Sequence, residues 1–253
     1  MNTSDSAIFS DHTAAMKDAG EDELLYWRRL RLLGISLSIL MLWNGVCDLI
    51  YGYSSKLSGS EYFSAAAWDI IRTAGNRPHW MVMLAQTAGW LYPLYALSYY
   101  HWWAGMRRAG FWLAYVPCGL LAYAILMIGG IQHCGWAFLS VLAQAKAVAG
   151  STDAAFYATA QNFIVEHFFF GDLTALLAFY AGSIWHAVGV LSGRTAYPRW
   201  YVVVSPLGVL VITMIIGALL PAPLAGFVIA PFGTWFMLVP CLASTVWLWN
   251  GPR

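Results

Sequence analysis

The sequence predicts an all-α fold, a polytopic bundle of six transmembrane helices with both termini in the cytoplasm. The chain has 253 residues, of which 60% are hydrophobic and only 10% are charged, and its mean hydropathy is +0.62. A soluble domain has roughly 45–50% apolar and about 25% charged residues. The chain also contains 14 Trp, 14 Tyr and 13 Phe, and aromatic rings collect at the two interfaces of a bilayer. Both features indicate a surface that faces lipid.

Six apolar stretches are long enough to span a bilayer, which takes roughly 20 mostly apolar residues. They cover about residues 32–53, 80–103, 111–147, 154–191, 200–220 and 227–249. The third and fourth stretches would each reach roughly 55 Å as a straight helix, against about 30 Å of hydrocarbon. We therefore expect helices 3 and 4 to extend beyond the outer surface as a hairpin, with a bend at Gly129-Gly130.

Lys and Arg residues orient the bundle, because they concentrate in cytoplasmic loops. With the N-terminus inside, nine of them lie on inner segments, namely Lys17, Arg28, Arg29, Arg31, Arg107, Arg108, Arg194, Arg199 and Arg253. Four lie on outer segments, namely Lys56, Arg72, Arg77 and Lys146. This bias predicts that both ends are cytoplasmic. Residues 1–31 are then a polar cytoplasmic tail, and residues 32–253 form the transmembrane domain.

The connection 54–79 carries a pattern of its own. Ser58 and Glu61 have the spacing of a capping box, and apolar residues follow on one helical face from Tyr62 to Ile71. The pattern predicts an amphipathic helix that lies on the outer membrane surface. A packed loop helix with no role as a lid is the alternative.

The net charge of +1 argues against nucleic acid as a partner, because no basic face is available to neutralise phosphates. We expect the lipid bilayer and a lipophilic small molecule as partners, and no cofactor. The cysteines lack C-x-x-C spacing and lie in apolar stretches, as Cys47, Cys118, Cys134 and Cys241. We expect them to be small buried hydrophobic residues.

Several motifs are built mainly from glycine and proline. They are Gly193-Arg-Thr-Ala-Tyr-Pro-Arg-Trp200, Ser205-Pro-Leu-Gly208, Leu219-Leu-Pro-Ala-Pro-Leu-Ala-Gly226 and Pro231-Phe-Gly233, with Gly129-Gly-Ile-Gln-His133 in the third stretch. Together they resemble an uncharacterised family of bacterial six-span integral membrane proteins, and the likeness covers most of the chain beyond residue 32. The resemblance implies the six-span topology and supplies no functional residues. With it, we expect a multi-pass protein of the bacterial inner (cytoplasmic) membrane.

Charged and histidine side chains near the membrane are confined to the first four helices, because residues 200–252 contain no Asp, Glu, Lys, Arg or His. Such groups are costly within a bilayer, so by default they face the bundle interior or a cavity. The candidates are Asp48, His79, His101, His133, Glu166, His167, Asp172 and His186. We expect His101 and His186 to lie toward the inner interface and to be structural.

Counting residues from the inner ends of the helices gives each candidate a depth. If helices 3 and 4 form an antiparallel hairpin about residue 150, residues whose numbers total about 300 lie at one level. The count predicts a deeper layer with Asp48 and Asp172 and an outer layer with His133, Glu166 and His167. Phenylalanines flank Glu166 and would desolvate its carboxylate.

These layers favour an intramembrane enzyme that uses acid–base chemistry on a lipophilic, isoprenoid- or lipid-like substrate, as an isomerase or a cyclase does. Aromatic side chains would line its cavity and can stabilise a cation. The predicted catalytic residues are Glu166, His133 and Asp48, and the predicted substrate-binding residues are His167, Asp172, Asn44, Trp43, Trp136 and Phe169.

Three other interpretations stay open. The same residues would serve a carrier or receptor for a small molecule or proton, although no inverted repeat or broken midplane helix is visible. Two histidines and one or two carboxylates at the outer face would also bind a metal ion. A structural or partner-binding membrane subunit needs none of these side chains to react.

Overall fold

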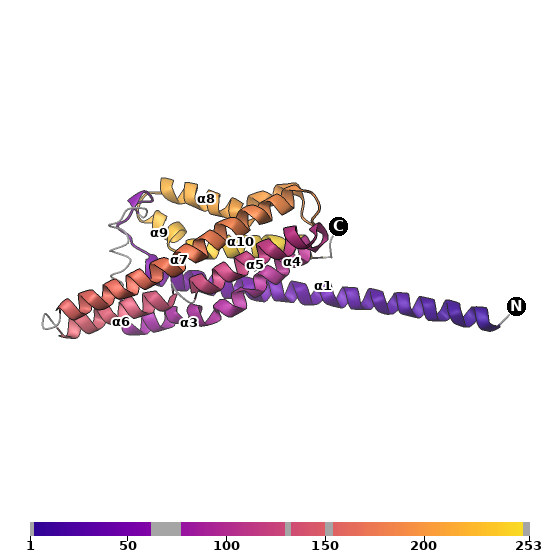
Figure 1. Cartoon of the computed structure of the whole chain (residues 1–253), viewed down its shortest axis with the longest axis horizontal. Coiled ribbons are helices and arrows are strands. Elements are labelled where there is room, and N and C mark those ends of the chain that lie inside the picture. Colours follow the sequence, from indigo (N-terminus) through magenta and orange to yellow (C-terminus); the bar gives the residue numbers. More distant parts are fainter. Residues whose placement is uncertain (1–2, 62–76, 130–132, 150–153, 250–253) are drawn as a thin grey trace.

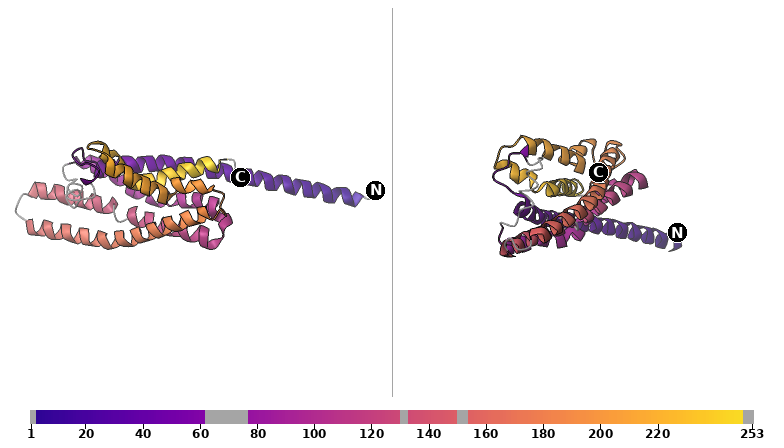
Figure 2. Two further views of the ribbon diagram at one scale, coloured as in Figure 1. Left: turned by 90° about the horizontal axis from the view of Figure 1, so that it is seen from above. Right: turned by 60° about the vertical axis from the view of Figure 1, so that its left-hand side comes forward.

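The computed structural model describes residues 3–61, 77–129, 133–149 and 154–249 (Figure 1). These residues form helices joined by turns, and no β-strand occurs among them. The predicted all-α class is therefore confirmed. The helices lie roughly along one long axis, with the N-terminal part of the first helix at one end and the tip of a long hairpin at the other (Figures 1 and 2).

The first helix, α1, runs without interruption from Thr3 to Gly52. No proline precedes Pro78 in the sequence, so nothing in this segment removes a backbone donor or forces a kink. The boundary predicted at residue 31 is not a break in the helix. The described part of the predicted polar tail is instead the N-terminal part of α1, which projects alone from the bundle (Figure 1).

The second apolar stretch forms two helices, α3 (His79–Tyr95) and α4 (Leu97–Met106). Pro93 lies inside α3, where its missing N–H leaves the carbonyl of Gly89 without its helical hydrogen bond, and α3 and α4 meet at Ala96. A short 3₁₀ helix, η3 (Arg107–Ala109), follows. Gly110 then turns the chain with a φ of 87°, a left-handed conformation that glycine adopts without strain.

The third stretch is also divided, into α5 (Phe111–Ile128) and α6 (Cys134–Ala149). The α5 helix ends immediately before Gly129, and the bend expected at Gly129-Gly130 falls partly on residues 130–132, which lie outside the described residues. The fourth stretch is a single helix, α7 (Ala154–Leu191), with the predicted bounds. The α6–α7 hairpin extends beyond the ends of the neighbouring helices (Figures 1 and 2).

Two glycines on α7 report the register of the hairpin. A Cβ added to Gly189 would lie 3.1 Å from the carbonyl oxygen of Leu113, and one added to Gly182 would lie 3.1 Å from Cβ of Leu120. In both pairs the residue numbers total close to 300. The antiparallel register expected from the sequence therefore holds along α5 and α7.

The C-terminal part begins with η5 (Arg199–Val204), followed by α8 (Pro206–Leu219), α9 (Leu224–Ile229) and α10 (Phe232–Trp247). Ser205 caps α8, because its hydroxyl accepts a hydrogen bond from the backbone N–H of Gly208, and Pro206 occupies the first helical position, where its missing N–H costs nothing. The predicted turn at Pro221-Ala-Pro223 separates α8 from α9.

The outer surface of the bundle is apolar. Among the described residues, three helical segments are long and apolar enough to cross a membrane, namely Glu23–Gly52, Phe111–Ile128 and Leu173–Leu191, and α8 and α10 are shorter apolar helices. Large apolar side chains are exposed on several helices, including Trp90 (66%), Leu219 (80%) and Val246 (71%). Exposed apolar surface on this scale fits contact with lipid, so the chain has the character of a membrane protein.

The two ends of the bundle differ in their charged residues. At one end, Arg31 lies over the ring of Trp249 at 5.2 Å and Arg107 lies over the ring of Trp27 at 5.7 Å. The loop before η5 reaches the same end, because the N–H of Ala196 donates to the carbonyl of Gly105. This arginine-rich end is where the projecting part of α1 leaves the bundle (Figure 1).

The opposite end holds the connection after α1. Arg77 donates a hydrogen bond to the carbonyl of Tyr53, and the Glu61 carboxylate accepts 2.6 Å hydrogen bonds from the N–H and the hydroxyl of Ser58. The Ser58–Glu61 contact expected for a capping box is therefore present. These hydrogen bonds lower the pKa of the Glu61 carboxyl. The amphipathic helix predicted over 54–79 falls mainly on residues 62–76, which lie outside the described residues.

Glycines on α1 allow α10 to approach it closely. A Cβ added to Gly34 would collide with Oγ1 of Thr245 and would lie 2.8 Å from Nε2 of His101. A Cβ added to Gly45 would lie 3.2 Å from Cγ2 of Thr234. Small residues at helix contacts are typical of membrane bundles, because they let backbones approach.

We expect Gly34→Ala to destabilise the protein, since its methyl group has no room beside Thr245 and His101. Overpacking of a close contact costs about 1–3 kcal/mol, which thermal unfolding of the detergent-solubilised protein measures. Gly119→Ala is the matched control, because nothing lies within 4 Å of a Cβ added to that helical glycine. It should leave stability unchanged or raise it by up to about 1 kcal/mol. Equal melting temperatures for the two variants would contradict the close α1–α10 packing.

Candidate functional site

The carboxylate of Asp48 is the centre of a buried polar cluster near the end of α1. Its Oδ2 atom accepts hydrogen bonds from Nδ2 of Asn44 and from the hydroxyl of Thr234, each at 2.9 Å. Its Oδ1 atom lies 3.1 Å from Nε2 of His133. Asn44 also donates to the Thr234 hydroxyl at 2.8 Å. Three donors from three helical segments thus converge on one carboxylate.

His133 is enclosed by aromatic rings. Its ring centroid lies 4.9 Å from that of Tyr92 and 5.8 Å from that of Tyr51. The exposed fraction of the side chain is 5% for His133 and 11% for Asp48. The Nδ1 atom of His133 is buried and has no hydrogen-bond partner among the described residues. One nitrogen of the imidazole is therefore held by Asp48, and the other is available.

Local sequence explains how these side chains meet. Asn44 and Asp48 are four residues apart on α1 and therefore share one face. Gly45, between them, leaves the space in which Thr234 of α10 approaches. His133 immediately precedes α6, and a Cβ added to Gly89 of α3 would lie 3.2 Å from its Cβ. Glycines on two helices thus bring Thr234 and His133 to the Asp48 carboxylate.

The surroundings of the cluster tie α1 to α3. The Tyr51 hydroxyl donates to the carbonyl of Val82 at 3.2 Å and to the side-chain oxygen of Gln86 at 3.4 Å. The indole N–H of Trp43 donates to the hydroxyl of Thr87 at 2.9 Å. Predicted as a substrate-binding residue, Trp43 is thus held against α3 beside the cluster.

The structure places Asp48 and His133 in direct contact, so their predicted assignment to two separate layers is wrong. The predicted depths were counted from the inner ends of the helices, with Leu32 as the inner end of the first span. Arg107 lies over Trp27, so Trp27 and not Leu32 is level with the start of α5. Asp48 is then about 32 Å above that level and His133 about 33 Å above Phe111, at 1.5 Å per residue. Corrected in this way, the two residues share one height.

Glu166 does not join the cluster. It is an exposed residue of α7, so the expected burial of its carboxylate among phenylalanines is wrong. It belongs to α7, the helix that pairs with α6 in the projecting hairpin (Figure 1). A helix with few neighbours buries only a narrow face, and Glu166 lies off that face. The structure therefore removes the reason for choosing Glu166 as the acid–base residue.

Four predicted substrate-binding residues have side chains outside the described part of the structure. Trp136 belongs to α6, and His167, Phe169 and Asp172 belong to α7. Of the two other predicted substrate-binding residues, Trp43 and Asn44, it is Asn44 that contacts Asp48 directly.

Sequence reasoning missed Thr234, Tyr51 and Tyr92. Thr234 lies in a segment with no ionisable residue, where one hydroxyl among several carries no mark of function. A usable signal was Gly45 beside Asn44, because a glycine next to polar helix residues indicates close approach of another helix. Tyr51 and Tyr92 are two of 14 tyrosines, and only the packing of α1 against α3 distinguishes them.

A second buried polar cluster occupies the arginine-rich end. Nδ1 of His101 lies 2.8 Å from the Ser244 hydroxyl, which lies 2.6 Å from the Tyr197 hydroxyl. His186 is fully buried beside Trp102, with ring centroids 5.9 Å apart, and neither of its ring nitrogens has a partner among the described residues. Both histidines are buried and lie toward the arginine-rich end, the end at which the sequence predicted them.

The remaining candidates have simpler environments. Nδ1 of His79 lies 3.1 Å from Oε1 of Gln144, which joins the start of α3 to α6. Cys47, Cys118 and Cys241 are free and buried, as expected for small apolar residues. Within the described ranges, no three His, Cys, Asp or Glu side chains are grouped so as to hold a metal ion.

Comparisons with protein-family models, with curated proteins and with solved structures gave no match to this chain. The chemistry of the cluster is therefore argued from its geometry. A carboxylate that accepts from an imidazole fixes the orientation and the tautomer of that imidazole, and leaves the opposite nitrogen to exchange a proton. The Asp48–His133 pair has this arrangement, with Nδ1 of His133 as the nitrogen that has no partner among the described residues.

We expect Thr234→Val to destabilise the protein, because it keeps the side-chain shape and removes a hydroxyl that donates to Asp48 and accepts from Asn44. Hydrogen bonds to a charged group contribute about 1.5–3 kcal/mol, and unfolding in detergent measures the loss. Thr234→Ser keeps the hydroxyl and should be clearly more stable than Thr234→Val. In an Asp48→Asn background the difference should shrink, as a double-mutant cycle requires of contacting residues. A Thr234→Val variant as stable as Thr234→Ser would contradict the network.

Proposed function

We propose that this chain is a six-span protein of the bacterial inner membrane with both ends in the cytoplasm. The arginine-rich end then faces the cytoplasm, in keeping with the bias of Lys and Arg toward inner loops. Arg31 and Arg107 lie at this end with Trp27 and Trp249, the residue types that anchor a span at its interface. The shorter apolar helices α8 and α10 are the fifth and sixth spans, and each follows a short helix, η5 before α8 and α9 before α10.

The site that this topology places near the outer surface is an acid–base centre. We propose that the protein is an intramembrane enzyme in which His133 is the proton-exchanging residue and Asp48 is the carboxylate that orients it. The observation that carries the proposal is the difference between the two ring nitrogens of His133, of which one contacts Asp48 and the other has no partner among the described residues. Its Nε2 is bound to Asp48 at 3.1 Å, while its buried Nδ1 has no partner within the described residues.

The hydrogen bonds at Asp48 support a fixed orienting role. Asn44 and Thr234 both donate to its carboxylate, so the ionised form satisfies every contact, and a fixed anion beside an imidazole stabilises the imidazolium that forms when Nδ1 takes a proton. General acid–base catalysis of this kind contributes typically 10²–10⁴-fold to a rate. Glu166, being exposed, has no part in the proposed reaction.

A lipophilic substrate suits the walls of the site. Tyr51 and Tyr92 enclose His133, and Cys47 and Tyr51 form an apolar cluster with Val82 and Trp43. Aromatic walls favour an isoprenoid- or lipid-like molecule and stabilise a cation formed by protonation. An isomerisation or cyclisation needs only proton transfer between such a substrate and Nδ1.

A proton carrier is the second candidate. A row of buried aromatic side chains on α3 and α4, namely Tyr92, Tyr95, Tyr99 and Trp102, runs from His133 toward His186. Ring contacts join Tyr92 to His133 at 4.9 Å and Trp102 to His186 at 5.9 Å. Two protonatable sites at opposite ends of the bundle are the arrangement that a proton carrier requires.

The topology predicts the location of reporter fusions. Fusions after residues 109 and 195 should report the cytoplasm, and fusions after residues 150 and 222 should report the outer side, because the arginine-rich loops remain inside. Paired alkaline phosphatase and green fluorescent protein fusions measure this. A cytoplasmic signal at residue 150 would place the Asp48–His133 site on the inner side and contradict the proposed topology.

The catalytic proposal predicts a change in membrane lipids. Cells that produce the wild-type protein should contain a lipophilic product that is absent from cells producing His133→Gln, because Gln cannot exchange the proton. Asp48→Asn should reduce the product by about 10²-fold or more. Chromatographic comparison of lipid extracts detects the product even when an isomerisation leaves its mass unchanged.

Glu166→Gln is the matched control, and it should behave as the wild type. A loss of product in Glu166→Gln with normal His133→Gln would overturn the assignment of the site. Proteoliposomes that contain a pH-sensitive dye test the second candidate. Proton uptake that depends on His133, with no change in lipids, would support the carrier and contradict the enzyme.

A further inference from the structure

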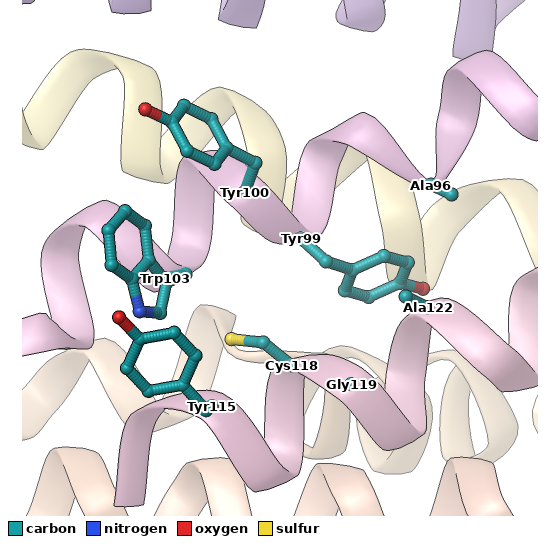
Figure 3. Close-up of a pocket in the computed structure, with 8 residues that line it drawn as sticks. All are labelled: Ala96, Tyr99, Tyr100, Trp103, Tyr115, Cys118, Gly119 and Ala122. Carbon is teal, nitrogen blue, oxygen red and sulfur yellow. The ribbon is translucent and has the colours of Figure 1, made fainter. Parts of the chain in front are cut away.

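A groove with a volume of about 380 Å³ lies between α4 and α5, away from the Asp48–His133 site (Figure 3). Small residues line one part of it, namely Ala96, which joins α3 to α4, and Gly119 and Ala122 of α5. Tyr100, Trp103 and Tyr115 form the aromatic part, in which the rings of Trp103 and Tyr115 have centroids 5.3 Å apart. The groove opens on the side of the bundle that faces lipid, since Tyr100 and Tyr115 are 45% and 50% exposed.

Polar atoms point into the aromatic part of the groove. The indole Nε1 of Trp103 is buried and has no hydrogen-bond partner among the described residues. In Figure 3 this nitrogen and the Tyr115 hydroxyl are turned toward one another at the same end of the groove. A buried indole N–H usually finds an acceptor. A ligand with an oxygen atom would supply one here.

That end of the groove is the arginine-rich end. The short helix η3 (Arg107–Ala109) joins α4 to α5 and therefore closes the groove next to Trp103 and Tyr115. Arg107 rests over the rings of Tyr26 and Trp27. Arg108, five residues beyond Trp103, is exposed and has no ion pair or ring contact in the described structure. Arg108 belongs to the short helix that joins the two helices lining the groove, and its guanidinium is free to bind an anion at this end of the bundle.

We infer that this groove binds an anionic phospholipid of the inner leaflet. The acyl chain lies along Ala96, Gly119 and Ala122, the ester oxygens accept from the indole N–H of Trp103, and the phosphate of the headgroup pairs with Arg108. Basic sites between membrane helices on the cytoplasmic side recognise anionic headgroups in this way. The positive charge of Arg108 favours an anionic lipid over a zwitterionic lipid. It also favours that lipid over the same face of a second copy of this protein.

Native mass spectrometry of the full-length protein, released from nanodiscs of equal parts phosphatidylglycerol and phosphatidylcholine, tests the inference. The wild type should retain phosphatidylglycerol in preference to phosphatidylcholine. Arg108→Gln should reduce the retained phosphatidylglycerol about fivefold, which corresponds to about 1 kcal/mol for one basic side chain. Trp103→Phe keeps the aromatic wall and removes the N–H, and should reduce retention of phosphatidylglycerol as well.

Arg194→Gln and Trp112→Phe are the matched controls, because Arg194 and Trp112 are exposed residues outside the groove. Both should retain phosphatidylglycerol as the wild type does, and thermal unfolding should show that all four variants are folded. Equal retention of the two lipids by the wild type would overturn the inference. So would an equal loss in Arg108→Gln and Arg194→Gln, or a lipid-free dimer in place of a lipid-bound monomer.

Discussion

The carboxylate of Asp48 imposes the main constraint on this bundle. An ionised group in a water-poor interior is costly unless hydrogen bonds satisfy it. Asn44, Thr234 and His133 meet that requirement from α1, α10 and the start of α6. The close approach of α10 at Gly45 and the tight packing of His133 against Gly89 follow from it. At this end of the bundle, α1, α10 and the start of α6 therefore pack around one anion.

The two buried polar clusters satisfy the hydrogen-bonding groups of their buried side chains in different ways. The Asp48 cluster surrounds its carboxylate with donors and leaves one imidazole nitrogen without a partner among the described residues. The cluster at the arginine-rich end has hydroxyls in place of a carboxylate, and those of Ser244 and Thr245 contact the two ring nitrogens of His101, while His186 lies among aromatic rings. An imidazole held by a fixed anion is suited to exchanging protons, whereas one held by hydroxyls mainly specifies how helices pack. This difference is the reason for proposing the Asp48 cluster, and not the cluster around His101, as the functional site.

Local patterns predicted the helices well and their relative heights poorly. The bounds of α7 and the end of α5 before Gly129 follow from turn residues and glycines that are visible in the sequence. The Asp48–His133 contact depends on which residue of α1 is level with the start of α5, and that is set by the packing of Trp27 against Arg107. The exposure of Glu166 depends on how many helices surround α7 at the height of that residue. Both are tertiary properties, and neither the period nor the composition of a single helix encodes them.

The continuity of α1 joins parts of the molecule that would otherwise be independent. One unbroken helix of 50 residues, roughly 75 Å long at 1.5 Å per residue, carries both the projecting N-terminal segment and Asp48. A helix without a proline or another break has no point at which to kink sharply. The backbone that positions Asp48 is therefore continuous with the projecting segment. The Asp48–His133 contact and the part of the chain farthest from the hairpin belong to one helix.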